Sequence, residues 1–395
     1  MTKPPLIFLV VGEPSGDLLG ARLMNGLKEI THGEVRFAGV GGAGMERAGL
    51  KSLFPMHELS VMGFVEILPR VPHLLSRMRE TVAEIRRIRP DAVVTIDTPA
   101  FSFRIGERLK GEGIPLIHYV APTVWAYRPR RAAGIARFLD HLLAILPFEP
   151  PYFEAVGLPC SFVGHPVLES VGTPDGPSFR NRHGIPSDVP LLAVLPGSRR
   201  SEVRRLLPVF GETIAALKDR IPNLHLMTAT LGAVAEDVAE AAATWPCPTV
   251  VITDPDEKTD AFAACDTALA ASGTVTLELA VAGVPMVVAY RASPVTAAVL
   301  RRIIRVRYVN LINLTLDAPV IPELLQEDCT IQRLVPAVER LLVDRDARDY
   351  QIERSREALA ALGGDEESPS RRAAKVILEV IASGPRPRGG KTANQ

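Results

Sequence analysis

Short runs of apolar residues alternate with longer amphipathic stretches along the first half of the chain. The apolar runs predict buried strands at 6–11, 35–40, 92–96, 116–120 and 141–146. Helical spacing of apolar residues predicts helices between them, at 17–30, 66–88 and 103–110. Strands without polar alternation, separated by helices, are typical of a parallel sheet covered by helices on both faces.

The pattern stops once and then starts again. Residues 164–190 are rich in Gly, Pro, Ser and Asp, which predicts a linker. Beyond it, the same reasoning predicts strands at 191–195, 224–229, 250–253, 268–271 and 286–289, and helices at 202–217 and 234–243. Pro208 and Gly211 predict a kink or a weak point in the first of these helices.

The prediction is therefore an α/β protein with two Rossmann-like, doubly wound domains of similar size. They cover residues 1–165 and 166–354, a helix over about 355–382 can return to the first domain, and 383–395 form a disordered tail. Ligands of such domains bind at the carboxyl ends of the strands, so we expect them in a cleft where the two domains face each other.

Composition narrows the class of protein. Lys+Arg 45 and Asp+Glu 45 cancel, which argues against a general nucleic-acid binder. The four cysteines form no Cys-x-x-Cys pair, which argues against a zinc site, an iron–sulfur cluster or a disulfide framework. The apolar start before Gly12 is too short for a signal peptide, and no apolar run reaches the ~18–20 residues of a membrane span. We expect a cytoplasmic protein, soluble or peripheral to a membrane.

Glycine-containing loops follow three predicted strands. In this arrangement, free backbone N–H groups at the start of a helix point toward an anion or a sugar. The loops are neither a dinucleotide motif nor a P-loop. The residues that could contact a ligand are Glu13, Ser15, Gly16 and Asp17 in the first loop, Gly197, Ser198 and Arg199 in the second, and Ser272, Gly273 and Thr274 in the third. A tight turn, with Ser15 or Asp17 as helix cap, explains the first loop equally well.

Other candidates combine carboxylates, an imidazole and an aromatic ring. Asp97 ends a central strand, where it could serve as a general base or only cap the next helix. His118 and Trp125 share one segment, although a lone histidine is more often structural, and Trp125 could form the wall of a sugar site. Glu278 lies one helical turn beyond the third loop, so its carboxylate could accept hydrogen bonds from a ribose diol or lie in a solvated first turn.

Two further patterns have weaker functional interpretations. The Asp-x-Asp triplets at 254–256 and 344–346 could hold Mg²⁺ or Mn²⁺, but arginines and N–H-rich loops could bind a diphosphate without metal. The arginine-rich stretch 301–307 is a solvated helix face by default, and a patch for anionic lipid or a phosphorylated substrate is the alternative.

Several of these motifs together resemble those of lipid-A-disaccharide synthases, inverting glycosyltransferases of the two-domain GT-B type. The similar segments run in order from about Leu6 to about Cys329 and include GEPSGD, VMGFVEILPR, HYVAPTVWAYRPRR, LPFEPPYFEAVGLPCSFVGHP, LPGSRRSEV, ASGTVTLELAVAGVPMVVAYR and NLINL. The chain departs from the pattern at Ala100, where a second carboxylate is usual, and at 316–319, where a basic residue is expected.

The resemblance implies a reaction between UDP-2,3-diacylglucosamine and 2,3-diacylglucosamine 1-phosphate, giving a β-1,6-linked lipid A disaccharide 1-phosphate and UDP. It implies no metal or cofactor, and work at the cytoplasmic face of the inner membrane as a peripheral protein. It places Asp97 at the reacting centre, the Glu13–Asp17 loop on the acceptor side, and Arg199, Ser272, Gly273, Thr274, Glu278 and Asn313 on the UDP side.

The alternatives are a UDP-N-acetylglucosamine 2-epimerase, another GT-B enzyme with a soluble acceptor, or a non-catalytic nucleotide-sugar-binding protein. A homo-oligomer is left open by the sequence.

Overall fold

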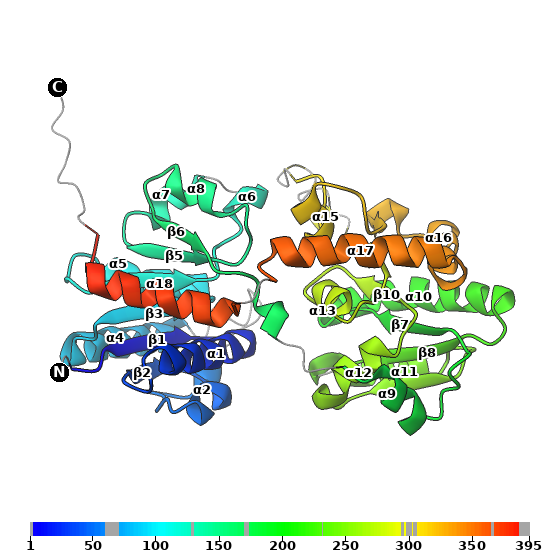
Figure 1. The fold of residues 1–395 in the computed structure, drawn as a ribbon, viewed down its shortest axis with the longest axis horizontal. Coiled ribbons are helices and arrows are strands. Elements are labelled where there is room, and N and C mark those ends of the chain that lie inside the picture. The colour runs from blue at the N-terminus through cyan, green and yellow to red at the C-terminus, as the bar shows by residue number, and fades with distance from the viewer. Residues whose placement is uncertain are drawn as a thin grey trace. The chain divides into compact units, whose positions relative to one another are not determined.

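The computed structural model describes residues 3–59, 71–127, 130–169, 174–230, 232–293, 296–297, 302, 306–364 and 367–386. The chain divides into two compact units, with Met1–Pro166 and Gly363–Gln395 in unit 1 and Val167–Leu362 in unit 2. Figure 1 shows the elements of both units. The segment at 60–70, most of the arginine-rich stretch at 301–307, and most of the predicted tail lie outside the described residues.

Unit 1 is built on a parallel sheet of six strands in the order β2-β1-β3-β4-β5-β6. The strands are β1 (Leu6–Val11), β2 (Arg36–Val40), β3 (Ala92–Ile96), β4 (Leu116–Tyr119), β5 (His141–Ala144) and β6 (Cys160–Phe162). Side chains of β1 alternate between the two faces, as the pleat requires. Phe8 and Val10 join one apolar cluster, whereas Ile7, Leu9 and Val11 join the other, so both faces are buried.

Helices cover the two faces of this sheet. They are α1 (Pro14–Ile30), α2 (Ala43–Arg47), α4 (Val71–Ile88), α5 (Pro99–Leu109), α6 (Val124–Tyr127), α7 (Arg131–Ile135), α8 (Pro150–Glu154) and α18 (Pro369–Ser383). The last of these comes from the far end of the chain and packs against α1 (Figure 1). A Cβ atom on Gly26 of α1 would lie only 3.0 Å from the Ser370 carbonyl oxygen, so the glycine permits this close approach.

Unit 2 repeats the design with six parallel strands in the order β12-β11-β10-β7-β8-β9. The strands are β7 (Leu191–Leu195), β8 (His225–Ala229), β9 (Thr249–Ile252), β10 (Thr267–Ala271), β11 (Met286–Tyr290) and β12 (Glu323–Leu325). Its helices are α9 (Gly176–Arg182), α10 (Arg200–Arg220), α11 (Ala235–Ala242), α12 (Lys258–Ala263), α13 (Val275–Val281), α15 (Leu311–Leu316), α16 (Ile331–Val343) and α17 (Arg345–Ala361). The predicted α/β class with two doubly wound domains is confirmed.

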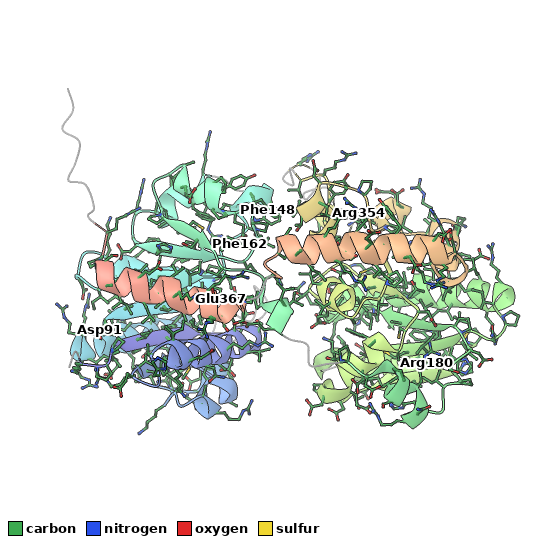
Figure 2. The ribbon with its side chains drawn as sticks, viewed as in Figure 1. Asp91, Phe148, Phe162, Arg180, Arg354 and Glu367 are labelled. Carbon is green, nitrogen blue, oxygen red and sulfur yellow. The ribbon has the colours of Figure 1, made fainter. Side chains whose placement is uncertain are left out.

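One local prediction is wrong, and two others can be compared with the structure. The predicted linker at 164–190 contains α9, which Asp175 caps by accepting from the Ser178 N–H, and Arg180 ties this helix to Asp266 (Figure 2). Helix α10 includes Pro208 and Gly211, the positions at which the sequence predicts a kink or a weak point, and Val209 and Phe210 beside the proline are buried. The chain leaves unit 2 after Leu362, later than predicted at 354, because α17 packs on α13 and α15.

Both sheets have a topological switch point beside their first strand. Strand β1 lies between β2 and β3, and β7 lies between β8 and β10. Connections that depart in opposite directions along a parallel sheet leave a crevice at the carboxyl ends of the two central strands. The loops after β1 and β3 border this point in unit 1, and the loops after β7 and β10 border it in unit 2. No helix in the described part of the chain is long and apolar enough to cross a membrane.

Candidate functional site

A cavity of about 340 Å³ occupies the switch point of unit 2. The predicted glycine loops at 197–199 and 272–274 border it, as do the ends of β7, β8 and β10. Its lining includes Gly197, Ser198, Arg199, Glu202, Thr230, Lys258, Phe262, Ser272, Gly273, Thr274 and Glu278. The structure therefore brings together all the residues predicted for the nucleotide side except Asn313.

The first loop of this cavity needs a glycine. Gly197 has φ +110°, a conformation that L side chains rarely adopt, and a Cβ there would lie 3.1 Å from a Glu202 carboxylate oxygen. The loop leads into the N-terminus of the long helix α10, where unpaired N–H groups and the helix dipole favour an anion.

Two ion pairs line the cavity. Glu278 accepts from Lys258 Nζ at 2.6 Å, and the largely buried Glu202 accepts from Arg199 Nη1 at 2.9 Å. The Tyr290 hydroxyl also donates to Glu202, at 3.4 Å. Sequence reasoning missed Lys258 and Glu202. Glu202 lies in the LPGSRRSEV segment. Lys258 could not be assigned to the site from the sequence, because its place there depends on where α12 starts relative to a neighbouring strand.

A buried hydroxyl also points to a ligand. Thr230, at the end of β8, is 4% exposed, and its Oγ1 has no hydrogen-bond partner among the described residues. Buried polar groups in native proteins are nearly always paired, so an orphan that lines a cavity is a natural contact for a bound molecule.

Asp97 follows β3 at the switch point of unit 1. Asp97 and Thr98 both have left-handed backbone, with φ +51° and +48°. Such strain costs about 1–3 kcal/mol per residue and gathers at functional sites. The Asp97 carboxylate accepts from the Thr98 N–H at 2.8 Å, and the Asp97 carbonyl accepts from the Ser102 hydroxyl. Thr98 Oγ1 is buried without a described partner.

The first glycine loop meets this strained turn. A Cβ on Gly12 would lie 2.9 Å from the Thr98 side chain, so the two loops touch at the switch point. Glu13 is half-buried beside them and Ser15 is exposed. Gly16 is a packing residue, because its Cβ would lie 2.8 Å from a methyl of Val11.

Three predicted contact residues make hydrogen bonds within the protein. The Asp17 carboxylate accepts three N–H bonds at 2.8–3.0 Å, from Gly42, Gly44 and Met45, so it holds the start of α2. His118 is 1% exposed and its Nδ1 bonds to Thr95 Oγ1; burial lowers its pKa to about 3. The imidazole is therefore buried inside the unit.

Asn313 is the third of these residues. It is buried, its amide donates to the Ile321 carbonyl and to Glu323 Oε1, and its Oδ1 accepts from the Ile321 N–H, each at 2.8 Å. With these bonds its side chain closes the loop after α15. A sequence motif cannot distinguish such a loop-closing amide from a ligand contact.

Trp125 depends on a carboxylate that sequence reasoning missed. Its Nε1 donates to Glu149 Oε1 at 3.1 Å, and its ring stands edge-on to Phe148 (labelled in Figure 2). Glu149 is 1% exposed, and its second oxygen accepts from the Ile145 and Leu146 N–H groups. Burial raises the Glu149 pKa to about 7 despite these bonds. This carboxylate thus joins α6 to the loop after β5.

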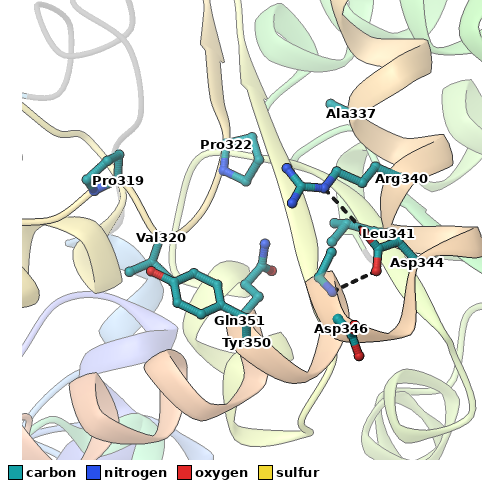
Figure 3. Close-up of a pocket in the computed structure, with 11 residues that line it drawn as sticks. Pro319, Val320, Pro322, Ala337, Arg340, Leu341, Asp344, Asp346, Tyr350 and Gln351 are labelled. Carbon is teal, nitrogen blue, oxygen red and sulfur yellow. Dashed lines mark hydrogen bonds and ion pairs between the residues drawn. The ribbon is translucent and has the colours of Figure 1, made fainter.

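The acidic triplets are helix caps. Asp254 accepts from the Asp256 N–H at 2.9 Å, and Asp344 accepts from the Ala347 N–H at the start of α17. Figure 3 shows Asp344 with its ion-pair partner Arg340 at the wall of a separate cavity of about 420 Å³. No group of three or more metal-ligating side chains occurs among the residues that the structure describes.

Solved structures define the class of fold. The chain is similar to the UDP-GlcNAc 2-epimerase of Neisseria meningitidis, bound to UDP-GlcNAc, with a TM-score of 0.62, 12% identity, and 96% and 100% of the two chains covered. It is equally similar to the glycosyltransferase of kitacinnamycin, with a TM-score of 0.62, 17% identity, and 95% and 99% covered. The chain has the GT-B fold.

Sequence comparison identifies the family within this class. A family model described as Lipid-A-disaccharide synthetase matches residues 7–378. The lipid-A-disaccharide synthase of Rhodospirillum centenum is 58% identical over 382 residues, which cover 96% of this chain and 95% of the relative. The chain belongs to the lipid-A-disaccharide synthase family and is a glycosyltransferase.

The buried Glu149 predicts a pH dependence of stability. Its pKa is raised from 4.5 to about 7 in the folded protein. Its contribution to the free energy of unfolding is therefore fully present below about pH 4.5 and is lost as the pH rises through 7. We expect urea unfolding to show that the free energy of unfolding of the wild type, relative to that of Glu149→Gln, falls by about 2–3 kcal/mol from pH 5 to pH 8. The control is Glu154→Gln, an exposed glutamate nearby. A pH-independent difference for Glu149→Gln would contradict the prediction.

Proposed function

We propose that the protein condenses UDP-2,3-diacylglucosamine with 2,3-diacylglucosamine 1-phosphate. The products are the β-1,6-linked lipid A disaccharide 1-phosphate and UDP. The observation that carries the proposal is the cavity of unit 2, in which two glycine loops, the N-terminus of a long helix and the Lys258–Glu278 pair come together. The family to which the chain belongs supports the choice of acylated sugars.

The cavity has the groups that a uridine diphosphate needs. Backbone N–H groups of Gly197 and Ser198 and the Arg199 guanidinium bind the diphosphate, with further N–H groups from the 272–274 loop. The Glu278 carboxylate accepts hydrogen bonds from the ribose diol, and the ion pair with Lys258 orients it. The Thr230 hydroxyl makes a further polar contact with the nucleotide.

The reaction moves one proton and inverts one carbon. The acceptor 6-hydroxyl oxygen bonds to the anomeric carbon of the donor as the bond from that carbon to the diphosphate oxygen breaks. Asp97 takes the hydroxyl proton as general base, and Glu13 orients the acceptor beside it. Arg199 and the N–H groups stabilise the negative charge that develops on the departing UDP. Positive charge is thus supplied by the chain itself, so the proposed mechanism uses neither metal nor cofactor.

The substrates place the reaction at a membrane surface. Each of them carries acyl chains, and burial of a methylene group in a bilayer stabilises it by about 0.8 kcal/mol. We infer a peripheral enzyme on the cytoplasmic face of the inner membrane, where water-soluble UDP leaves and the acylated product remains.

A UDP-N-acetylglucosamine 2-epimerase shares the fold, as the Neisseria structure illustrates. The product decides between the two activities. With both acylated substrates, we expect mass spectrometry to detect the disaccharide 1-phosphate and stoichiometric UDP, in the presence or absence of EDTA. Epimerisation of UDP-N-acetylglucosamine, with no disaccharide from the acylated sugars, would overturn the proposal.

Asp97→Asn tests the general base. Asparagine tolerates left-handed backbone and keeps the side-chain shape, so the strained turn survives while the proton acceptor is lost. We expect kcat to fall about 10²–10⁴-fold with UDP affinity unchanged. The matched control is Asp317→Asn, another aspartate with left-handed backbone, at φ +47° after α15, which should keep full activity. Activity of Asp97→Asn within a few-fold of the wild type would refute the assignment.

Glu278→Gln tests the ribose contact. The substitution keeps the shape but removes the charge that pairs with Lys258. In isothermal titration calorimetry with UDP alone, we expect the Kd to rise about 10–100-fold, as for loss of a hydrogen bond to a charged group. Glu236→Gln, at an exposed glutamate of the same unit, should leave the Kd unchanged. Equal UDP affinities of Glu278→Gln and the wild type would rule the contact out.

A further inference from the structure

A groove of unit 1 starts beside the Asp97 turn and has no part in the mechanism described above. It is a cavity of about 500 Å³ between α5 and the segment 131–138. Pro99 and Ala100 line one end of it, and they follow Asp97 and Thr98 directly along the chain. The N-terminus of α5, with its positive dipole end, therefore lies at the end of the groove nearest to the proposed general base.

The rim of this groove, called here the α5–α7 groove, is basic. Arg104, Lys110, Arg131 and Arg137 line it and are exposed, against one carboxylate, that of Glu107. Arg104, Lys110 and Arg131 form no ion pair with another residue in the described part of the chain.

Two arginines on the neighbouring helix α4 do have carboxylate partners. Arg77 and Arg86 on α4 pair with Glu58 and Glu112, at 2.6 Å in each case. In a chain of zero net charge, exposed cations that gather around a hollow without carboxylate partners indicate an anionic ligand.

The floor of the groove is apolar. Phe103, Ile135 and Phe138 line it with most of their surface buried, and the two phenylalanine rings lie 5.5 Å apart. The Arg131 guanidinium lies 5.7 Å from the Phe103 ring, which holds this cation over the floor. A Cβ on Gly134 would meet nothing within 4 Å, so the glycine leaves the hollow open.

We propose that the α5–α7 groove binds the phosphate of the acceptor sugar, with the first methylenes of an acyl chain on its apolar floor. This inference rests on the proposed function and specifies how the same site recognises its acceptor. A phosphomonoester dianion matches the planar donor forks of Arg104 and Arg131, which bind phosphate bidentately. Continuity with the Asp97 turn favours the acceptor over the UDP-sugar, whose diphosphate has its own cations in unit 2.

Anionic lipid headgroups also attract exposed cations, so a bilayer surface competes with the acceptor phosphate as the partner of these side chains. A membrane role for the same side chains is therefore an outcome that the test must detect.

The test compares two acceptors in detergent micelles at saturating donor. One is 2,3-diacylglucosamine 1-phosphate and the other is the same sugar without its phosphate. For Arg104→Gln and Arg131→Gln, we expect the KM for the phosphorylated acceptor to rise about 10–100-fold, with kcat and the Kd for UDP unchanged. In both variants, the preference for the phosphorylated acceptor should be smaller than in the wild type by the same factor, because the KM for the unphosphorylated sugar does not change.

Two further variants make the result specific. Gly134→Met fills the hollow without removing charge, and it should raise the KM for both acceptors. Arg36→Gln is the control, because Arg36 is exposed at the start of β2, at the opposite edge of the sheet. It should behave as the wild type with both acceptors.

The outcomes separate the subsite from the activity. Failure of the wild type to form disaccharide overturns the proposed function and the subsite with it. Normal activity with an unchanged KM in both arginine variants overturns the subsite alone, as does an equal rise for both acceptors. Loss of binding to phosphatidylglycerol vesicles, with unchanged KM in micelles, assigns these arginines to membrane docking and also overturns the subsite.

Discussion

Parallel pairing of one buried strand with neighbours on both sides is the constraint on which the molecule depends. Strand β1 pairs with β2 and β3, and β7 pairs with β8 and β10, so the connections leave each sheet in opposite directions. The backbone of a parallel sheet is fully bonded only when every strand is in register, and its faces are stable only under helices. The loops at the switch points are therefore the part of each unit that is free to carry ligand-binding groups.

Polar side chains beneath the loops convert these irregular turns into rigid ones. The Asp17 carboxylate holds the start of α2, Asn313 closes the loop after α15, and Glu149 joins Trp125 to the turn after β5. Each side chain satisfies two or more polar groups that would otherwise be buried without partners. The left-handed Asp97 has bonds of its own, because its carboxylate accepts from the Thr98 N–H and its carbonyl accepts from the Ser102 hydroxyl.

Much of the candidate site could be predicted because it lies in loops that follow apolar runs. The glycine loops at 197–199 and 272–274 do border one cavity, and Asp97 does end a central strand. The contributions of His118 and Asn313 could not be predicted, because exposure decides whether a polar side chain contacts a ligand or closes the interior. Their burial follows from packing against elements distant in sequence. Lys258 was missed for the same reason, since its partner Glu278 is on another helix.

By itself, the sequence determined the alternation of strands and helices, the division into two α/β domains, and the loops at which ligand chemistry is placed. These properties depend on the periodicity of apolar residues and on local turn chemistry, which neighbours along the chain decide. The sequence allowed the last helix to return to the first domain, and the tertiary structure decided that α18 packs against α1. Only the tertiary structure decided that Thr230 and Thr98 have buried hydroxyls without partners among the described residues, and that cations gather along α5. Those properties depend on contacts between segments far apart in sequence, because burial and pairing are set by what the fold brings together.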